Sequence, residues 1–269
     1  MRKNRYLRPD EEISFAKAYT CPADRQRNSV TRMRRMRKLV DAYLTDRKAD
    51  EALLKQVCRD HFEGEINEPR YGAAYGGFVS ICMHALTEGL DSSQTAASMF
   101  MTYDDTLGLM FRWAPCVPCL SVYVPFYWVK PEEGDMKLPE IMTKGGALYD
   151  PESLWWSVER LVTLVSMDEE RFGDTVRENL LALEADFEES AKEAEENARE
   201  AVRCGDTDKA RRMLDGLTVE CAETLRQTAL LIGNDLAQEI KQCGGCYGPR
   251  RELIEAYTKR VQMPVCVME

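Results

Sequence analysis

Two Cys-x-x-Cys pairs are the residues whose type and spacing most directly suggest chemistry in this chain. They are Cys116-Val-Pro-Cys119 and Cys243-Gly-Gly-Cys246. Together the pairs could supply the four thiolates of a tetrahedral zinc site. They lie far apart in the sequence, so their spacing does not place them together. The sequence therefore predicts free thiols and no metal or other cofactor, with a four-cysteine site at Cys116, Cys119, Cys243 and Cys246 as the weaker alternative.

The two histidines, His61 and His84, are the candidate bases of a nucleophilic hydrolase. His84 ends an apolar, alternating segment and precedes a polar turn that contains Ser93, Gln94 and Thr95. A histidine in that place is more often a hydrogen-bonded structural residue. His61 follows a predicted helix, where it can interact with the negative end of the helix dipole. The sequence alone therefore does not decide whether each histidine has a catalytic or a structural role.

Positive charge is concentrated at the start of an otherwise acidic chain. The net charge is −10, yet residues 1–40 hold twelve Lys and Arg against four Asp and Glu. An arginine cluster of this kind can bind nucleic acid, but no aromatic side chains are interleaved with it to stack on bases. The acidic remainder also disfavours a polyanionic partner. We therefore expect the basic segment to contact acidic groups of its own chain or of a protein partner, and we predict no nucleic-acid partner.

Composition limits the class of protein. The chain has 269 residues, of which 44% are hydrophobic, which is enough for a sizeable core. The apolar runs are far shorter than the roughly 20 residues of a membrane span, and the first thirty residues contain no apolar segment typical of a secretory signal. Ten cysteines in such a chain are expected to be free thiols in a reducing compartment. The prediction is a cytoplasmic protein without membrane contact.

Hydrophobic periodicity predicts an α+β fold. Spacings of three and four predict helices over residues 29–45, 49–61, 152–166, 173–203, 208–242 and 250–260. Alternation predicts four antiparallel strands over residues 78–84, 96–103, 107–113 and 121–129. The two longest helices flank a short joint in which Gly205 suits a left-handed helix end and Thr207 is a candidate N-cap. They are therefore expected to form an antiparallel hairpin.

Seven stretches in chain order carry a resemblance to a known family. They are Phe15-Ala-Lys-Ala-Tyr19, the arginine run up to Val40, Cys58-Arg-Asp-His-Phe62, Ser80-Ile-Cys-Met-His84, Ser93-Gln-Thr-Ala-Ala-Ser98, Pro118-Cys-Leu-Ser-Val-Tyr-Val-Pro125 and Glu152-Ser-Leu-Trp-Trp-Ser-Val-Glu-Arg-Leu161. As an ordered set over residues of about 12–190, they resemble the secernin and cysteine-dipeptidase family of N-terminal-nucleophile hydrolases.

This resemblance implies an αββα sandwich and the hydrolysis of dipeptides or small amides by an N-terminal cysteine. In that family the cysteine's own α-amine serves as the base. The matching stretches are those of the family's C-terminal part, and the half that bears the nucleophile has no counterpart here. We therefore expect residues 1–166 to form part of the sandwich, with strands at about 78–129, and residues 167–269 to form a helical hairpin and tail. The residues that carry over as candidate active-site support are Arg27, Arg32, His84, Ser93, Gln94 and Thr95.

Two functions remain open at this stage. In the first, the chain is a fragment or subunit of a cysteine dipeptidase, inactive alone, which acts on a dipeptide or small amide once an N-terminal half completes it. In the second, it is a non-catalytic protein-interaction module built on the hydrolase half-fold. Either function predicts a homo-oligomer or a partner chain, because a half-sandwich leaves an apolar sheet face uncovered. The candidates for that face are Phe78, Ile81, Met83, Met99, Met101, Leu109, Phe111, Val122 and Val124.

Overall fold

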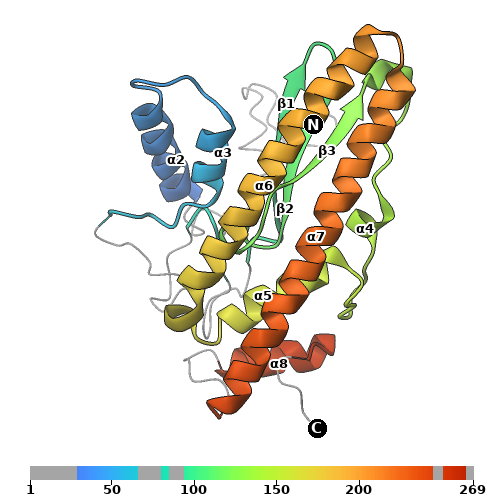
Figure 1. Cartoon of the computed structure of the whole chain (residues 1–269). Helices are drawn as coiled ribbons and strands as arrows, with labels where there is room; N and C mark the ends of the chain where they lie inside the picture. Colours follow the sequence, from blue (N-terminus) through green and yellow to red (C-terminus); the bar gives the residue numbers. More distant parts are fainter. Residues whose placement is uncertain (1–28, 66–79, 85–93, 245–250, 265–269) are drawn as a thin grey trace, which may run out of the picture.

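The computed structural model describes residues 29–65, 80–84, 94–244 and 251–264. These residues form an α+β fold in which two long helices run beside a small antiparallel sheet (Figure 1). The helices are α2 (Ser29–Tyr43), α3 (Glu51–Cys58), α4 (Glu140–Thr143), α5 (Leu154–Val165), α6 (Glu169–Arg203), α7 (Thr207–Gln242) and α8 (Arg251–Val261). The strands are β1 (Ala97–Asp104), β2 (Gly108–Pro115) and β3 (Val124–Val129), and short 3-10 turns lie at η4 (Pro118–Leu120) and η5 (Pro131–Glu133).

The sheet has the order β1-β2-β3, and both pairs of neighbours are antiparallel. Asp104 accepts hydrogen bonds from the backbone N–H groups of Thr106 and Leu107, which forms the tight turn into β2. Gly108 completes the turn with a φ of +100°, where a Cβ atom would come within 2.8 Å of the Trp128 carbonyl oxygen. Three of the four predicted strands are thus confirmed, together with the irregular connection that contains Pro118.

The predicted strand at residues 78–84 is wrong over its described part, residues 80–84, which are not a strand. The apolar alternation there has another cause. The Cys82 N–H donates to the Asp60 carbonyl oxygen (3.1 Å), and the Met83 N–H donates to the Thr95 hydroxyl (2.9 Å). These partners replace the ladder of a neighbouring strand. Alternation here separates side chains that enter a buried cluster from side chains that do not.

The long helices α6 and α7 form the predicted antiparallel hairpin. Gly205 has a φ of +83° and ends α6 in the left-handed conformation. The N-cap of α7 is Asp206, whose carboxylate accepts the Lys209 N–H (3.0 Å), so the prediction of Thr207 as the cap is wrong by one residue. Asp and Thr are both good caps, and the sequence does not show which side chain turns back toward the helix.

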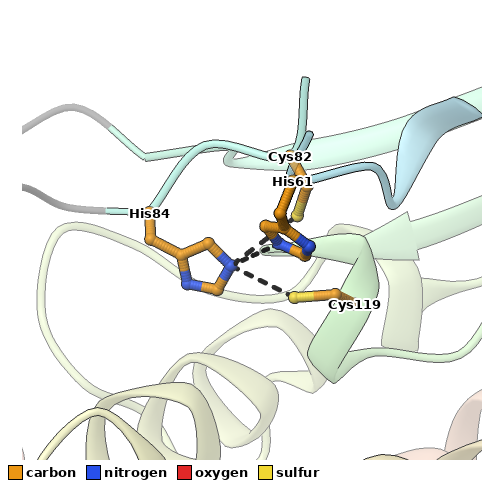
Figure 2. A group of neighbouring side chains, drawn as sticks. All are labelled: His61, Cys82, His84 and Cys119. Carbon is orange, nitrogen blue, oxygen red and sulfur yellow. Dashed lines mark hydrogen bonds between the residues drawn. The ribbon is translucent and has the colours of Figure 1, made fainter. Parts of the chain in front are cut away.

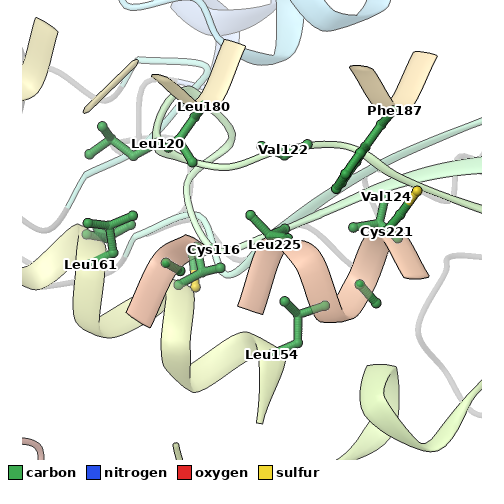
Figure 3. Packing of buried hydrophobic residues seen from close by; sticks show 14 of the residues in the cluster. Cys116, Leu120, Val122, Val124, Leu154, Leu161, Leu180, Phe187, Cys221 and Leu225 are labelled. Carbon is green, nitrogen blue, oxygen red and sulfur yellow. The ribbon is translucent and has the colours of Figure 1, made fainter. Parts of the chain in front are cut away.

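One hydrophobic cluster joins the hairpin to α5 and to the strands β2 and β3 (Figure 3). Leu180 and Phe187 of α6 face Leu225 of α7, and Val124 of β3 and Leu161 of α5 belong to the same cluster. The residues that recur every three or four positions along α6 and α7 thus form the faces that the structure buries. No described helix is both long enough and apolar enough to cross a membrane.

The apolar residues expected on an uncovered sheet face have different outcomes. Phe78 lies outside the described residues, and Ile81, Met83 and Leu109 are partly buried. Phe111, Val122 and Val124 are buried, so for them the expectation is wrong. The reason is that Val122 and Val124 pack into the core that the hairpin completes, while Phe111 stacks on a phenylalanine of β3 at 4.6 Å. Met99 and Met101 are more than half exposed, at 56% and 52%.

Removing the N-cap of α7 is expected to destabilise the hairpin by about 1 kcal/mol, because one backbone N–H loses its partner. The variant is Asp206→Ala, and the measurement is the free energy of unfolding in urea. Lys209→Ala is the matched control. Its exposed side chain takes no part in the cap, and its backbone N–H stays in place. Equal stability of the two variants would contradict the capping role.

Candidate metal centre

Four side chains able to bind a metal converge in the interior, next to the sheet. They are His61, Cys82, His84 and Cys119, and their ligand atoms all lie within 4.8 Å of one another. Figure 2 shows the two imidazole rings and the Cys119 thiol directed toward a common centre. All four residues are buried, with exposed fractions between 0% and 8%. Among the residues that the structure describes, this is the one group with such an arrangement.

The distances from His84 Nε2 to the other three donor atoms are close to those around a tetrahedral zinc ion. The Nε2 atoms of His61 and His84 are 3.1 Å apart. His84 Nε2 lies 3.1 Å from Cys119 Sγ and 3.8 Å from Cys82 Sγ. Zn–N bonds of about 2.0–2.1 Å and Zn–S bonds of about 2.3 Å separate tetrahedral ligand atoms by about 3.3–3.8 Å. No two of the four donor atoms are more than 4.8 Å apart, so shifts of up to about 1 Å would bring all four into contact with one ion.

Three separate segments supply the ligands, and each is fixed by its own contacts. His61 follows the end of α3, where Asp60 is held by the Arg35 guanidinium at 2.6 Å. Cys82 and His84 lie in the short segment whose backbone bonds to Asp60. Cys119 is part of η4, and the guanidinium of Arg59 donates to the carbonyl oxygen of the preceding Pro118 (2.8 Å). The ligands are therefore positioned by the surrounding fold and not by a single loop.

A carboxylate orients one of the histidines. His61 Nδ1 lies 3.1 Å from Glu63 Oε1, and the backbone N–H of His61 donates to Glu63 Oε2 (2.9 Å). This contact places the Nδ1 proton toward Glu63 and leaves the lone pair of Nε2 for the centre of the group. Histidine ligands of metals commonly have such a carboxylate partner, which fixes the tautomer and makes the ligand more basic.

Electrostatics in the group favour a bound cation. Burial would raise the pKa of the Cys82 thiol, but hydrogen bonds with Cys119, His61 and His84 lower it well below its ordinary value. Burial would lower the pKa of His61, but Cys82 and Glu63 raise it to about 9. Burial and the adjacent Cys82 raise the pKa of Cys119. One thiolate thus opposes ionisation of the other, and a dication between them removes that repulsion.

The residues predicted from the sequence are only partly brought together here. His84 and Cys119 join the centre. Arg32 donates to the Ile81 carbonyl oxygen (3.5 Å), next to the segment of Cys82. Thr95 pairs with the backbone of Met83 in that same segment. Arg27 and Ser93 lie outside the described residues.

The other cysteines and Gln94 lie in different surroundings. The thiol of Cys116 donates to the Trp155 carbonyl oxygen, and that of Cys243 contacts Arg171. Gln94 donates to Glu159 (2.7 Å), and Cys246 lies outside the described residues. The four-cysteine alternative paired Cys119 with Cys116 and Cys243. Neither of these two residues belongs to the group that contains Cys119 in the structure.

Sequence reasoning did not assign His61, Cys82 or His84 as metal ligands. A signal was nevertheless present, because three of the stretches that resemble the secernin family contain all four residues. Cys58-Arg-Asp-His-Phe62 contains His61, Ser80-Ile-Cys-Met-His84 contains two ligands, and the stretch that begins at Pro118 contains Cys119. Histidine and cysteine in those stretches could have been considered together as one ligand set.

Neutralising the carboxylate behind His61 is expected to weaken metal binding by about 10–100-fold, the usual effect of losing such a partner. The variant is Glu63→Gln, and the measurement is zinc affinity by competition with a chelating dye. Glu65→Gln is the matched control, because Glu65 pairs with Arg35 and Lys38 and not with His61. If both variants bind zinc as tightly as the parent chain, Glu63 has no role in orienting the ligand.

No family model, curated protein or solved structure matches this chain. The resemblance to the secernin family therefore remains a prediction that rests on the sequence stretches quoted above. The proposals for the metal centre below are therefore argued from the types, distances and burial of its own residues.

Proposed function

We propose that this chain is a zinc-binding protein that holds one Zn²⁺ ion through His61, Cys82, His84 and Cys119. The observation that carries the proposal is the convergence of four buried donor atoms within 4.8 Å of one another. Buried polar side chains need partners, and two thiols with two imidazoles in one place are best satisfied by a shared cation.

The donor types favour zinc over the other common metals. Magnesium and calcium prefer oxygen ligands at longer distances and with more ligands. Thiolate and imidazole nitrogen in a tetrahedral set are typical of zinc. Glu63 contacts the centre only through the far nitrogen of His61. The inner set is thus two sulfur and two nitrogen atoms.

The role that fits this geometry is structural. Catalytic zinc sites keep one position open for water or substrate, whereas structural sites are closed by four protein ligands. Here all four tetrahedral positions have a protein ligand, and Cys82 is fully buried. The ion would fasten the segment after α3 and the segment of residues 80–84 to η4, and hence to the sheet and α6.

Metal analysis of the purified full chain tests this proposal. We expect one zinc per chain, retained through dialysis. Replacement of zinc by cobalt should give the visible spectrum of a tetrahedral site with two thiolates. Cys82→Ser and Cys119→Ser should each abolish stoichiometric binding, whereas Cys243→Ser should leave it intact. Zinc that is absent after refolding with the metal, or that is lost only in Cys243→Ser, would overturn the assignment.

The cysteine-dipeptidase function, and the αββα sandwich on which it depends, remain a second proposal that rests on the family resemblance. An antiparallel sheet that packs its third strand along a helical hairpin supports it. Cys82 beside two histidines resembles a nucleophile with its base, but no substrate can reach a fully buried thiol. In this proposal the nucleophile therefore belongs to an N-terminal half, and the partner chain covers the exposed Met99 and Met101.

A panel of dipeptides tests the second proposal directly. The chain alone is expected to give no turnover, and addition of an N-terminal half that begins with the nucleophilic cysteine is expected to restore it. Turnover by the chain alone that Cys82→Ala abolishes would instead make Cys82 the nucleophile. No turnover by the completed pair would remove the dipeptidase proposal and leave the zinc proposal unchanged.

A further inference from the structure

A second site lies away from the proposed metal centre, between α5 and α8. It is a cavity of about 450 Å³ whose wall also includes Gln94 and Ala96, just before β1. None of the four proposed zinc ligands lines it. Its volume falls within the range of about 300–1,000 Å³ that is typical of pockets for small molecules.

The walls of the cavity are largely apolar and include two aromatic residues from different helices. Trp155 comes from α5 and Tyr257 from α8, with Val162 and Leu253 beside them. The indole N–H of Trp155 donates to the Ala96 carbonyl oxygen (2.8 Å), which fixes the ring. Rigid aromatic walls of this kind suit a flat apolar body, because aromatic pairs gain from stacked and edge-on contacts.

The carboxylate that lines the cavity already has hydrogen-bond partners. The carboxyl group of Glu159 is 2% exposed and accepts hydrogen bonds from Gln94 (2.7 Å) and the Tyr257 hydroxyl (2.8 Å). Burial raises its pKa, and hydrogen bonds from Tyr257, Cys116 and Gln94 only partly oppose that shift. Glu159 therefore holds the walls together, and it offers a cationic ligand little negative charge.

Arg260 is the charged group of the cavity that remains available to a ligand. It is exposed, lines the cavity, and stacks its guanidinium over the Tyr257 ring at 5.6 Å from the ring centre. Among the described residues, no acid forms an ion pair with it. A guanidinium presents several donors in a plane that matches the two oxygens of a carboxylate.

We propose that this cavity binds a small aromatic carboxylate, with its ring between Trp155 and Tyr257 and its carboxylate on Arg260. The site has one arginine and apolar walls, which suits a monoanion with an apolar body better than a phosphate. The same arginine at the cavity wall repels an amine of equal size. The proposal goes beyond zinc binding and does not depend on it.

Three probes that share one carbon skeleton test this assignment by isothermal titration calorimetry on the purified full chain. They are 2-naphthylacetate, 2-(2-naphthyl)ethanol and 2-(2-naphthyl)ethylamine. The acid is expected to bind at least tenfold more tightly than the alcohol, and the amine to bind least. Arg260→Gln should reduce the affinity for the acid to that for the alcohol, while the affinity for the alcohol stays unchanged.

A second variant keeps the test decisive. Ala256 is exposed and lines the cavity, so Ala256→Trp is expected to fill it without disturbing the fold and to abolish binding of all three probes. Thermal unfolding of each variant checks that it remains folded. Tighter binding of the amine than of the acid, acid binding unaffected by Arg260→Gln, or no binding of any probe would each overturn the proposal.

Discussion

Loss of the proposed zinc ion is expected to lower the melting temperature of this protein by about 10–20 °C. Structural zinc contributes apparent binding free energies of about 10–16 kcal/mol in zinc-finger peptides, where the ion supports the whole fold. In this chain the core around α6 and α7 includes Cys82 and Cys119 but extends far beyond them along both helices. We therefore expect a smaller loss, on the order of 5 kcal/mol, which corresponds to about 2–4 °C per kcal/mol at this size.

The loss should be concentrated where the ion joins separate segments. Cys119→Ser or treatment with a chelator is expected to expose residues 51–65 and 80–84 to proteolysis, while the α6–α7 hairpin keeps its helical circular dichroism signal. Cys204→Ser is the control, because Cys204 is exposed and lies at the far end of α6. If the zinc is removed and both the melting temperature and the proteolysis pattern stay the same, the metal does not stabilise the fold.

The second large effect is expected from Glu184, a buried carboxylate of α6 that fastens α3 to the body of the protein. Arg59 donates to both of its oxygens, at 2.9 and 2.6 Å, and the Lys55 ammonium lies 3.3 Å away. The backbone N–H of Tyr123 donates to it as well (2.9 Å). Glu184→Ala leaves the buried Lys55 and the largely buried Arg59 without their shared anion, which costs about 3–5 kcal/mol.

This variant should also weaken zinc binding. Arg59 donates to the carbonyl oxygens of Pro118 and Ser121, on either side of Cys119. An arginine released from Glu184 no longer holds that turn in place. The control is Glu188→Ala, because Glu188 contacts Lys55 from a half-exposed position and pairs of that kind contribute about 1 kcal/mol or less. Equal losses of stability and of zinc affinity in the two variants would contradict a special role for Glu184.

The contribution of Glu184 should depend on pH in a defined direction. Burial would raise the pKa of its carboxyl, but Arg59 and Lys55 hold it below the ordinary value. A carboxyl whose pKa is lowered by folding stabilises the protein at neutral pH and loses that contribution as the pH falls through its folded pKa. The difference in stability between the parent chain and Glu184→Ala should therefore be constant from pH 6 to 8 and shrink in acid, as denaturant unfolding can measure.

The long helices and three strands followed from the sequence because local patterns determine them. In α6 and α7, apolar residues recur every three or four positions, and only a helix brings such residues onto one face. In β1 to β3, alternation and turn residues act together over a few positions. The uneven distribution of charge along the sequence also predicted a contact correctly. The basic segment was expected to contact acids of its own chain, and Arg35 does so with Asp60.

The convergence of the four proposed metal ligands and the conformation of residues 80–84 were decided by tertiary structure. Alternation in Ser80-Ile-Cys-Met-His84 is the same whether the partner is a strand or a loop. The backbone of Asp60 and the side chain of Thr95 are the partners that exclude a strand. His61, Cys82 and Cys119 have no common period, so no local rule relates them. Their donor atoms meet because contacts between distant segments fold three parts of the chain onto one point, and such contacts leave no trace in residue spacing.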